Sequence, residues 1–284
     1  MNRQAFYAVL TLLLIPLGIC LIILKMTVPS SAPKHSPVQI VTDRVAYQQL
    51  AQAIVADDGE VTVLDGKLAT PQQKKKFKGA EVVLADNHAS PLLTQRQKLH
   101  LHSKILVASD SFTGQSANNY WLSPQATLQT ISRLSDLLSD LDPQNRDFYI
   151  RQSQQLLAQT QPLADGIARL QAEQNVQYLA TNHAQQVFMT QLGYQPAQKD
   201  LGTATATDFE TLTKKMQDHT IRFVLTASQD QSDQDQRVIQ LATQYQVPII
   251  TFNQVLPAGE KVWDWQLNFV NQLQAALKPV EGGK

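Results

Sequence analysis

The feature that most constrains this fold is a long central stretch with helical spacing, from Ser123 to about Asn175. Ser123-Pro124 is a typical helix start, because serine caps free backbone N–H groups and proline needs no N–H at the first helical position. Asp142-Pro143 repeats the pair, and apolar residues then recur at roughly helical intervals in a polar, glutamine-rich background.

The second part of this stretch, residues 143–175, is long for a helix inside one compact domain. About 30 helical residues at about 1.5 Å each reach roughly 45 Å. We therefore predict one long helix that joins two lobes, with Pro162 and Gly166 as candidate kink positions.

Short strand patterns alternate with helix patterns on both sides of this connector, which is typical of parallel sheets covered by helices. We predict an α/β fold of two lobes, each a parallel sheet flanked by helices, with lobes at 38–142 and 176–284. The predicted strands cover 38–42, 60–64, 81–85, 104–108, 176–180, 222–226 and 248–252, and the predicted helices 44–56, 71–78, 184–192, 208–218, 235–245 and 265–277.

The first 26 residues contain an apolar run from Phe6 to Met26, preceded by Arg3. About 20 apolar residues are enough to span a bilayer and exceed the apolar core of a cleaved signal. We interpret residues 1–26 as an uncleaved transmembrane anchor, with a cleaved signal or a lipidated Cys20 as alternatives. We predict that residues 27–37, rich in Ser and Pro, form a flexible tether. With any of the three N-terminal alternatives, we expect the rest of the chain to face outward, as on a Gram-positive cell.

Composition excludes several classes of function. Lys plus Arg equals Asp plus Glu at 24 each, so no global field recruits nucleic acid. The single cysteine, Cys20, lies in the apolar run, so the folded part has neither a disulfide nor a cysteine metal site. Neither a glycine-rich phosphate loop nor a G-x-S-x-G motif is present, and we predict that the chain is not an enzyme.

The segment Tyr120-Trp121-Leu122-Ser123-Pro124, followed by Leu141-Asp142-Pro143-Gln144-Asn145 and Tyr149, resembles the zinc- and manganese-binding solute-binding proteins of ABC importers. The resemblance covers about 38–277. It implies two α/β lobes joined by one long helix, with a zinc or manganese ion held between them and delivered to a membrane permease by a monomeric receptor. Histidines, alone or with carboxylates, normally hold that metal.

The family's ligand positions hold other residues here. Lys67 or Leu68 stands at the first, Asn119 at the second, Asn182 at the third and Asn253 at the last. An amide oxygen is a poor ligand for zinc, and an ammonium repels a cation. These residues suit hydrogen bonding to a neutral or anionic ligand better than metal binding.

Two histidines could rebuild part of a metal site. His183 lies one residue beyond Asn182, and His88 follows the third strand close to Asp86. We favour the interpretations that His183 is an ordinary loop histidine and that His88 lies at a solvated strand end. Three functions remain open: a receptor that still delivers a metal through His183 and His88, a receptor whose metal binding is weakened or lost, and an adhesin-like or regulatory surface protein with the same fold.

Overall fold

The computed structural model describes residues 37–112, 119–227 and 232–278. The chain divides into two units, Met1–Pro37 and Val38–Lys284, and every helix and strand below belongs to the second. Within the described residues, no helix is both long and apolar enough to cross a membrane. The predicted anchor lies outside the described residues, as does the predicted tether apart from Pro37.

The N-terminal lobe is built on a four-stranded parallel sheet in the order β2-β1-β3-β4. Its strands are β1 (Val38–Thr42), β2 (Gly59–Val63), β3 (Val82–Ala85) and β4 (Lys104–Val107), and its helices are α2 (Val45–Val55), α3 (Pro71–Gly79) and α4 (Pro91–Lys98). Short 3-10 helices lie at η1 (Ala56–Asp58) and η2 (Ala108–Ser111).

Alternation along the strands decides which helices cover each face of this sheet. Val82 and Leu84 of β3 pack into the cluster that contains α2, whereas Val83 between them packs with Phe77 of α3 and Leu92 of α4. Because successive side chains point to opposite faces, a fully apolar strand such as β3 is buried on both sides.

The C-terminal lobe has a second parallel sheet with the corresponding order, β6-β5-β7-β8. Its strands are β5 (Gln177–Ala180), β6 (Gln195–Pro196), β7 (Ile221–Ala227) and β8 (Ile249–Phe252), and its helices are α8 (Gln186–Gln191), α9 (Ala206–Gln217) and α10 (Asp233–Gln244). Helices α9 and α10 pack on one face through the cluster that contains Leu179 and Val224, and both begin with a capping box.

The predicted single connecting helix over residues 143–175 is wrong. After α5 (Pro124–Leu141) and the 3-10 turn η4 (Pro143–Asn145), the chain forms two helices, α6 (Arg146–Gln159) and α7 (Gln161–Ala172). Pro162 cannot donate an N–H and its ring conflicts with the carbonyl of the preceding turn, so α6 ends at Gln159, Thr160 lies between the two helices, and proline occupies the first turn of α7.

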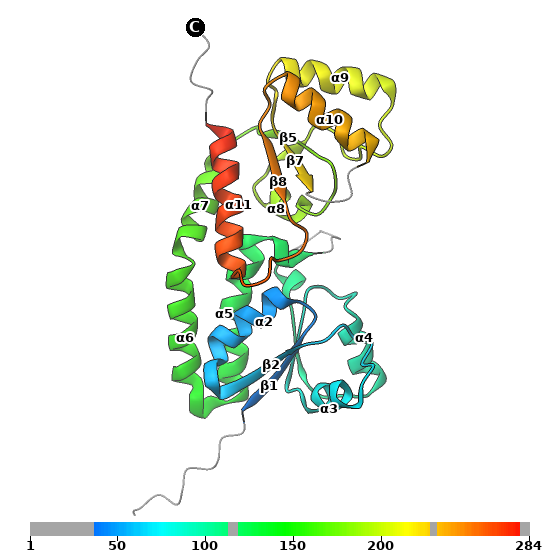
Figure 1. Cartoon of the computed structure of the whole chain (residues 1–284). Helices are drawn as coiled ribbons and strands as arrows, with labels where there is room; N and C mark the ends of the chain where they lie inside the picture. The colour runs from blue at the N-terminus through cyan, green and yellow to red at the C-terminus, as the bar shows by residue number, and fades with distance from the viewer. Residues whose placement is uncertain (1–36, 113–118, 228–231, 279–284) are drawn as a thin grey trace, which may run out of the picture. The chain divides into compact units, whose positions relative to one another are not determined.

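Gly166 lies inside α7 at the contact between α7 and α11 (Val262–Leu277), which run side by side in Figure 1. A Cβ at this position would lie 2.6 Å from Cγ1 of Val270 on α11. The Gly166 carbonyl also accepts a hydrogen bond from Nε2 of Gln274 at 3.0 Å. The glycine therefore permits a close approach of two helices and does not mark a kink.

One apolar core runs through both lobes. It includes buried residues of β1, β3, α2 and α5 together with residues of α7, α8, β7 and α11. The side-chain amide of Gln49 on α2 donates to the Glu260 carbonyl at 2.8 Å and accepts from the Val262 N–H at 2.7 Å. The start of α11 is thus fastened to the N-terminal lobe.

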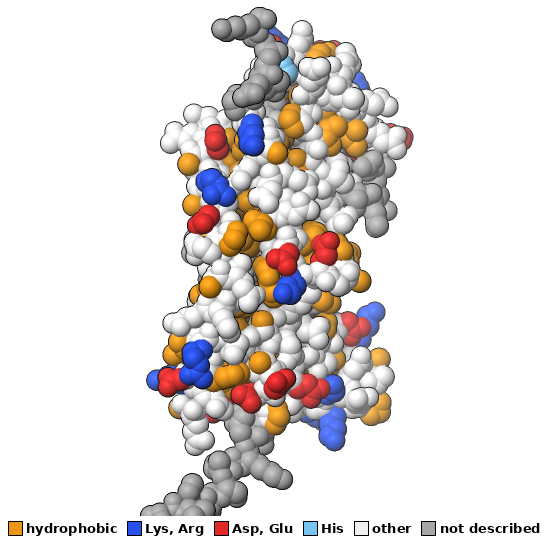
Figure 2. All heavy atoms as spheres, turned by 60° about the vertical axis from the view of Figure 1, so that its left-hand side comes forward, with side chains coloured by type: hydrophobic (Ala, Val, Ile, Leu, Met, Phe, Trp, Pro, Cys, Tyr) orange, Lys and Arg blue, Asp and Glu red, His pale blue; other side chains and the backbone are white. Residues whose placement is uncertain are grey.

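Charges are distributed evenly over the surface that Figure 2 shows. Cationic and anionic side chains are interspersed on that face, with neither sign gathered into a large patch. This agrees with the formal net charge of zero.

Candidate functional site

The carboxylate of Asp86, at the end of β3, organises the segment around Trp121. Asp86 is 1% exposed, and its Oδ1 accepts the Tyr47 hydroxyl at 2.8 Å and the Trp121 N–H at 2.9 Å. Its Oδ2 accepts the N–H groups of Asn119 at 2.9 Å and Tyr120 at 3.1 Å. Burial and the neighbouring Asp86 raise the pKa of Tyr47 well above its usual value, so this hydroxyl remains a donor.

This arrangement fixes the 3-10 helix η3 (Tyr120–Leu122) and the start of α5 behind it. Asn119 adopts a left-handed conformation with φ 68° and ψ 47°, which asparagine tolerates better than most residues. Ser123 caps α5 as predicted, with its Oγ accepting the Ala126 N–H at 3.4 Å. The Ser123 hydroxyl also donates to Oε1 of Gln191 on α8 at 2.6 Å, which links the two lobes here.

A pocket of about 210 Å³ lies between the lobes next to Trp121. It is lined from the N-terminal lobe by residues 43–46, Val63 and Trp121, and from the C-terminal lobe by residues 254–256. The Trp121 ring stacks on Trp265, with centroids 5.6 Å apart. The indole N–H of Trp121 is buried and has no hydrogen-bond acceptor within the described part of the chain. We refer to this pocket as the interlobe pocket.

Arg44 and Asp43 are the charged residues of the interlobe pocket. Both oxygens of Asp43 accept the Asp86 N–H, at 3.2 and 3.3 Å, and burial raises the pKa of Asp43 although this backbone hydrogen bond opposes the shift. Among the described residues, no hydrogen bond or ion pair engages the Arg44 guanidinium, and its Nε is fully buried. The charge of Arg44 acts on the neighbouring Asp43, whose pKa it lowers in part, but within the described residues the guanidinium has no hydrogen-bond acceptor.

The four positions that the family resemblance singles out do not line one common pocket. Lys67 is exposed, and its backbone N–H donates to Oδ1 of Asp65, while the neighbouring Leu68 is buried in the core. Asn119 lies two residues before Trp121, and the exposed Asn253 directly precedes Gln254 of the interlobe pocket. Asn119 and Asn253 are thus close in sequence to residues that line the interlobe pocket, but neither of them lines it.

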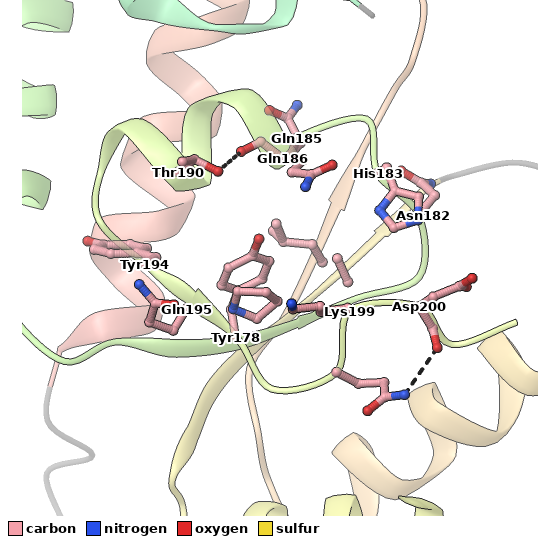
Figure 3. Close-up of a pocket in the computed structure, with 14 residues that line it drawn as sticks. Tyr178, Asn182, His183, Gln185, Gln186, Thr190, Tyr194, Gln195, Lys199 and Asp200 are labelled. Carbon is pink, nitrogen blue, oxygen red and sulfur yellow. Dashed lines mark hydrogen bonds between the residues drawn. The ribbon is translucent and has the colours of Figure 1, made fainter. Parts of the chain in front are cut away.

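Asn182 lies elsewhere, with His183, at the rim of a pocket of about 460 Å³ formed by the C-terminal lobe alone. Oδ1 of Asn182 accepts the Ala184 N–H at 2.9 Å, and His183 is exposed. Figure 3 shows both side chains on the loop after β5, at one side of this pocket. We refer to it as the β5–α8 pocket.

The two candidate metal-binding histidines belong to different lobes. His88 is exposed in the N-terminal lobe, where its Nε2 contacts Oδ1 of Asp110 at 2.5 Å. Arg133 lies 3.7 Å from the other oxygen of Asp110, so this aspartate already has two partners. Among the described residues, no three His, Cys, Asp or Glu side chains form a group that could hold a metal ion.

Comparison with known proteins connects this geometry to a family. Residues 40–276 match the family model described as zinc-uptake complex component A periplasmic, ZnuA. The chain belongs to the ZnuA family. This is a family of metal-binding solute-binding proteins and not one of enzymes. Among curated proteins, none matches the sequence.

Solved structures show the same fold as this ZnuA-family chain at low sequence identity. A periplasmic metal binding protein from Candidatus Liberibacter asiaticus has a TM-score of 0.64 at 13% identity, covering 84% of this chain and 98% of that one. Its Mn-bound form gives 0.63 at 15% identity over the same shares. A mutant laminin-binding adhesin (Lmb) from Streptococcus agalactiae gives 0.63 at 11% identity, covering 85% of this chain and 100% of that one.

Sequence reasoning missed Arg44 and the role of Asp86. The candidate residues predicted from the sequence lie in loops after other strands, although the loop after β1 also lies at the carboxyl end of a strand, where ligands in open α/β sheets bind. Arg44 comes two residues after β1, so this rule would have found it. Asp86 lies close in sequence to the candidate metal ligand His88, but its oxygens accept hydrogen bonds from backbone N–H groups and from the Tyr47 hydroxyl.

Proposed function

We propose that this ZnuA-family chain is an outward-facing solute-binding protein of the ABC-importer type in which transition-metal binding is weakened or lost. The Arg44 guanidinium in the interlobe pocket carries the proposal. A cation placed about 4 Å from a guanidinium is repelled by about 4 kcal/mol at an effective dielectric constant near 20, before nearby carboxylates compensate. Asp43 supplies one such carboxylate, and its raised pKa shows that burial disfavours its charge.

The residues at the family's ligand positions support the same conclusion. Lys67 is an ammonium, and Asn119, Asn182 and Asn253 offer neutral amide oxygens in place of imidazole or carboxylate. Weak binding through His183 or His88 stays an alternative, but these two histidines lie in different lobes. A ligand with acceptor oxygens suits the free guanidinium better than a metal ion does.

In this proposal the receptor is monomeric, is held at the outer face of the membrane by its N-terminal segment, and delivers its solute to an ABC permease. Family membership supports the permease as partner. The interspersed surface charges in Figure 2 do not favour nucleic acid as a partner.

Metal titration tests the proposal directly. The chain is purified without chelator, its zinc and manganese contents are measured, and both metals are titrated by calorimetry. We expect no stoichiometric metal in the wild type. Near-stoichiometric zinc or manganese bound with submicromolar affinity would refute the loss of metal binding.

Two arginine variants sharpen this test. Arg44→Ala removes the charge from the interlobe pocket, and we expect any residual zinc binding to strengthen. Arg151→Ala removes an exposed arginine from α6 and serves as the matched control, with no expected change. Equal zinc binding in both variants would show that the guanidinium does not exclude the metal.

A surface interaction role is the second candidate. The similar fold of the laminin-binding adhesin and two exposed apolar side chains at the interlobe pocket, Val45 at 51% and Val255 at 75%, favour it. Binding to immobilised laminin, measured by surface plasmon resonance, separates the two functions. The leading proposal expects no saturable binding, and the adhesin role requires it together with a loss in Val255→Ser.

A further inference from the structure

The β5–α8 pocket is a concavity within one lobe, separate from the interlobe pocket. It lies between α8 and the β5–β6 edge of the sheet, and no residue lines both pockets. Its volume of about 460 Å³ is in the range of small-molecule sites, which is roughly 300 to 1,000 Å³. The size suits a ligand of one or two sugar rings.

The floor of this pocket combines an apolar surface with one hydroxyl. Tyr178 of β5 is 4% exposed, and its ring stacks on Phe223 with centroids 5.9 Å apart. Its hydroxyl has no hydrogen-bond partner in the described residues, and in Figure 3 it points toward α8 across the pocket. Burial raises the pKa of Tyr178 to about 12, so the hydroxyl both donates and accepts hydrogen bonds at neutral pH.

Side-chain amides dominate the walls. Gln186 and Gln195 are exposed, line the pocket and make no side-chain hydrogen bond to other described residues, so each amide offers its donors and its acceptor. Gln198 donates to the Asp200 carbonyl at 3.2 Å, which leaves its own oxygen available. A ligand here must therefore both donate and accept hydrogen bonds around its periphery.

The opposite charges of the Lys and Asp side chains that line this pocket cancel. Lys199 and Asp200 both line it, and Oδ1 of Asp200 is occupied by the Gly202 N–H at 2.9 Å. With one cation and one partly engaged carboxylate, the wall has no net charge that would select an anion or a cation. An uncharged ligand meets these groups without being repelled by either.

We propose that the β5–α8 pocket binds a small neutral polyhydroxylated solute, a monosaccharide or disaccharide. Each sugar hydroxyl both donates and accepts, which matches amide side chains and the Tyr178 hydroxyl. The C–H faces of a sugar ring match the apolar floor that Tyr178, Pro196 and Leu225 provide. The inference is independent of the proposed function, because the pocket uses neither Arg44 nor Trp121.

The test uses the full chain and four probes: glucose, galactose, maltose and sucrose. Thermal-shift titration is followed by calorimetry on any sugar that raises the melting temperature, with sodium phosphate, glutamate and zinc chloride as comparison ligands. We expect saturable stabilisation by at least one of the four sugars. The inference is overturned if none of the four binds, and zinc binding would refute the proposed function while leaving this inference intact.

Two variants connect binding to the pocket. Tyr178→Phe keeps the ring and removes the hydroxyl, so the affinity should fall by about fivefold to tenfold, the effect of one hydrogen bond. Tyr245→Phe, a half-buried tyrosine outside the pocket, is the matched control and should bind as the wild type does. Gln195→Ala changes an exposed side chain and provides a second test if Tyr178→Phe fails to fold. Sugar affinity unchanged in both Tyr178→Phe and Gln195→Ala would place the sugar elsewhere and overturn the assignment.

Discussion

The substitution Asp86→Asn tests whether one buried carboxylate holds the segment around Trp121. An asparagine keeps the shape of the side chain but replaces one acceptor oxygen with an NH₂ donor and removes the charge. If the NH₂ group occupies the Oδ2 position, the N–H groups of Asn119 and Tyr120 both face a donor. If it occupies the Oδ1 position, the Tyr47 hydroxyl can turn and accept, but the Trp121 N–H loses its acceptor.

The expected loss in the free energy of unfolding follows from the less costly of these two orientations of the asparagine amide. One buried backbone N–H without an acceptor costs about 1–3 kcal/mol. The remaining hydrogen bonds lose their charge assistance, which adds about 1 kcal/mol. We expect the free energy of unfolding to fall by about 2–4 kcal/mol, a large part of the roughly 5–15 kcal/mol that stabilises a typical protein.

Urea unfolding followed by tryptophan fluorescence measures this loss, since Trp121 stacks on Trp265 next to the carboxylate. Hydrogen exchange gives a local readout. In Asp86→Asn, exchange should accelerate more at the amides of residues 119–121 than at those of the β3 strand. Asp140→Asn is the control: this side chain is 79% exposed, and its loss should change stability by less than about 0.5 kcal/mol. A loss in Asp86→Asn no larger than that of Asp140→Asn would refute the reasoning.

Three further predictions follow from the structure. Gly166→Ala places a Cβ 2.6 Å from Val270 Cγ1 and should lower the free energy of unfolding by about 1–3 kcal/mol in urea, whereas Gly79→Ala, where the new methyl meets no atom within 4 Å, should not destabilise. Burial raises the pKa of Asp43 above its ordinary 3.8, so the native state holds this proton longer than the unfolded chain, and its contribution to stability falls as pH rises through that window. Asp43→Asn removes a contribution that grows as pH falls, so the unfolding free energy of the variant should fall more steeply on acidification than that of the wild type, and an unchanged acid limb would contradict the assignment. Replacing Lys67, Asn119 and Asn182 by His and Asn253 by Asp should leave zinc affinity unchanged in calorimetry, because these four positions do not line one common pocket, and a rise of about tenfold would show that they converge on a metal.

Much of the fold was predictable because local signals agreed with tertiary packing. The apolar run at β1 was predicted with the observed bounds, and the Ser123-Pro124 helix start was confirmed by the hydrogen bond from the Ala126 N–H. Helix α4 was missed although Ser90-Pro91 repeats the same pair, because Leu92 alone among its residues is buried and helical spacing was not visible. Strand β6 has two residues, one of them Pro196, and too short a pattern to be recognised.

The candidate site was less predictable, because it depends on which loops the fold brings together. Nothing in the spacing of Arg44 and Gln254 indicates that they line one pocket 210 positions apart. The prediction of a single connecting helix was wrong for a different reason. Helical periodicity continues through Thr160, so the sequence predicts one helix with a kink at Pro162, whereas in the structure the proline separates two helices. The Asp86 network was hidden because its donors are backbone N–H groups, which the sequence of side chains does not show.

The hydrogen bonds between Gln49 and the start of α11 have a consequence for how the chain matures. They join residues 211 and 213 positions apart, so α2 cannot acquire these partners until nearly the whole chain has been synthesised. Because chains leave the ribosome from the N-terminus, the first lobe emerges with the surface that later receives α11 still uncovered. A ribosome stalled before residue 262 would expose the parts of α5 and α7 that contact α11 to chaperones, and truncation of the last helix should shorten the lifetime of the protein in the cell more than any loop deletion of equal length.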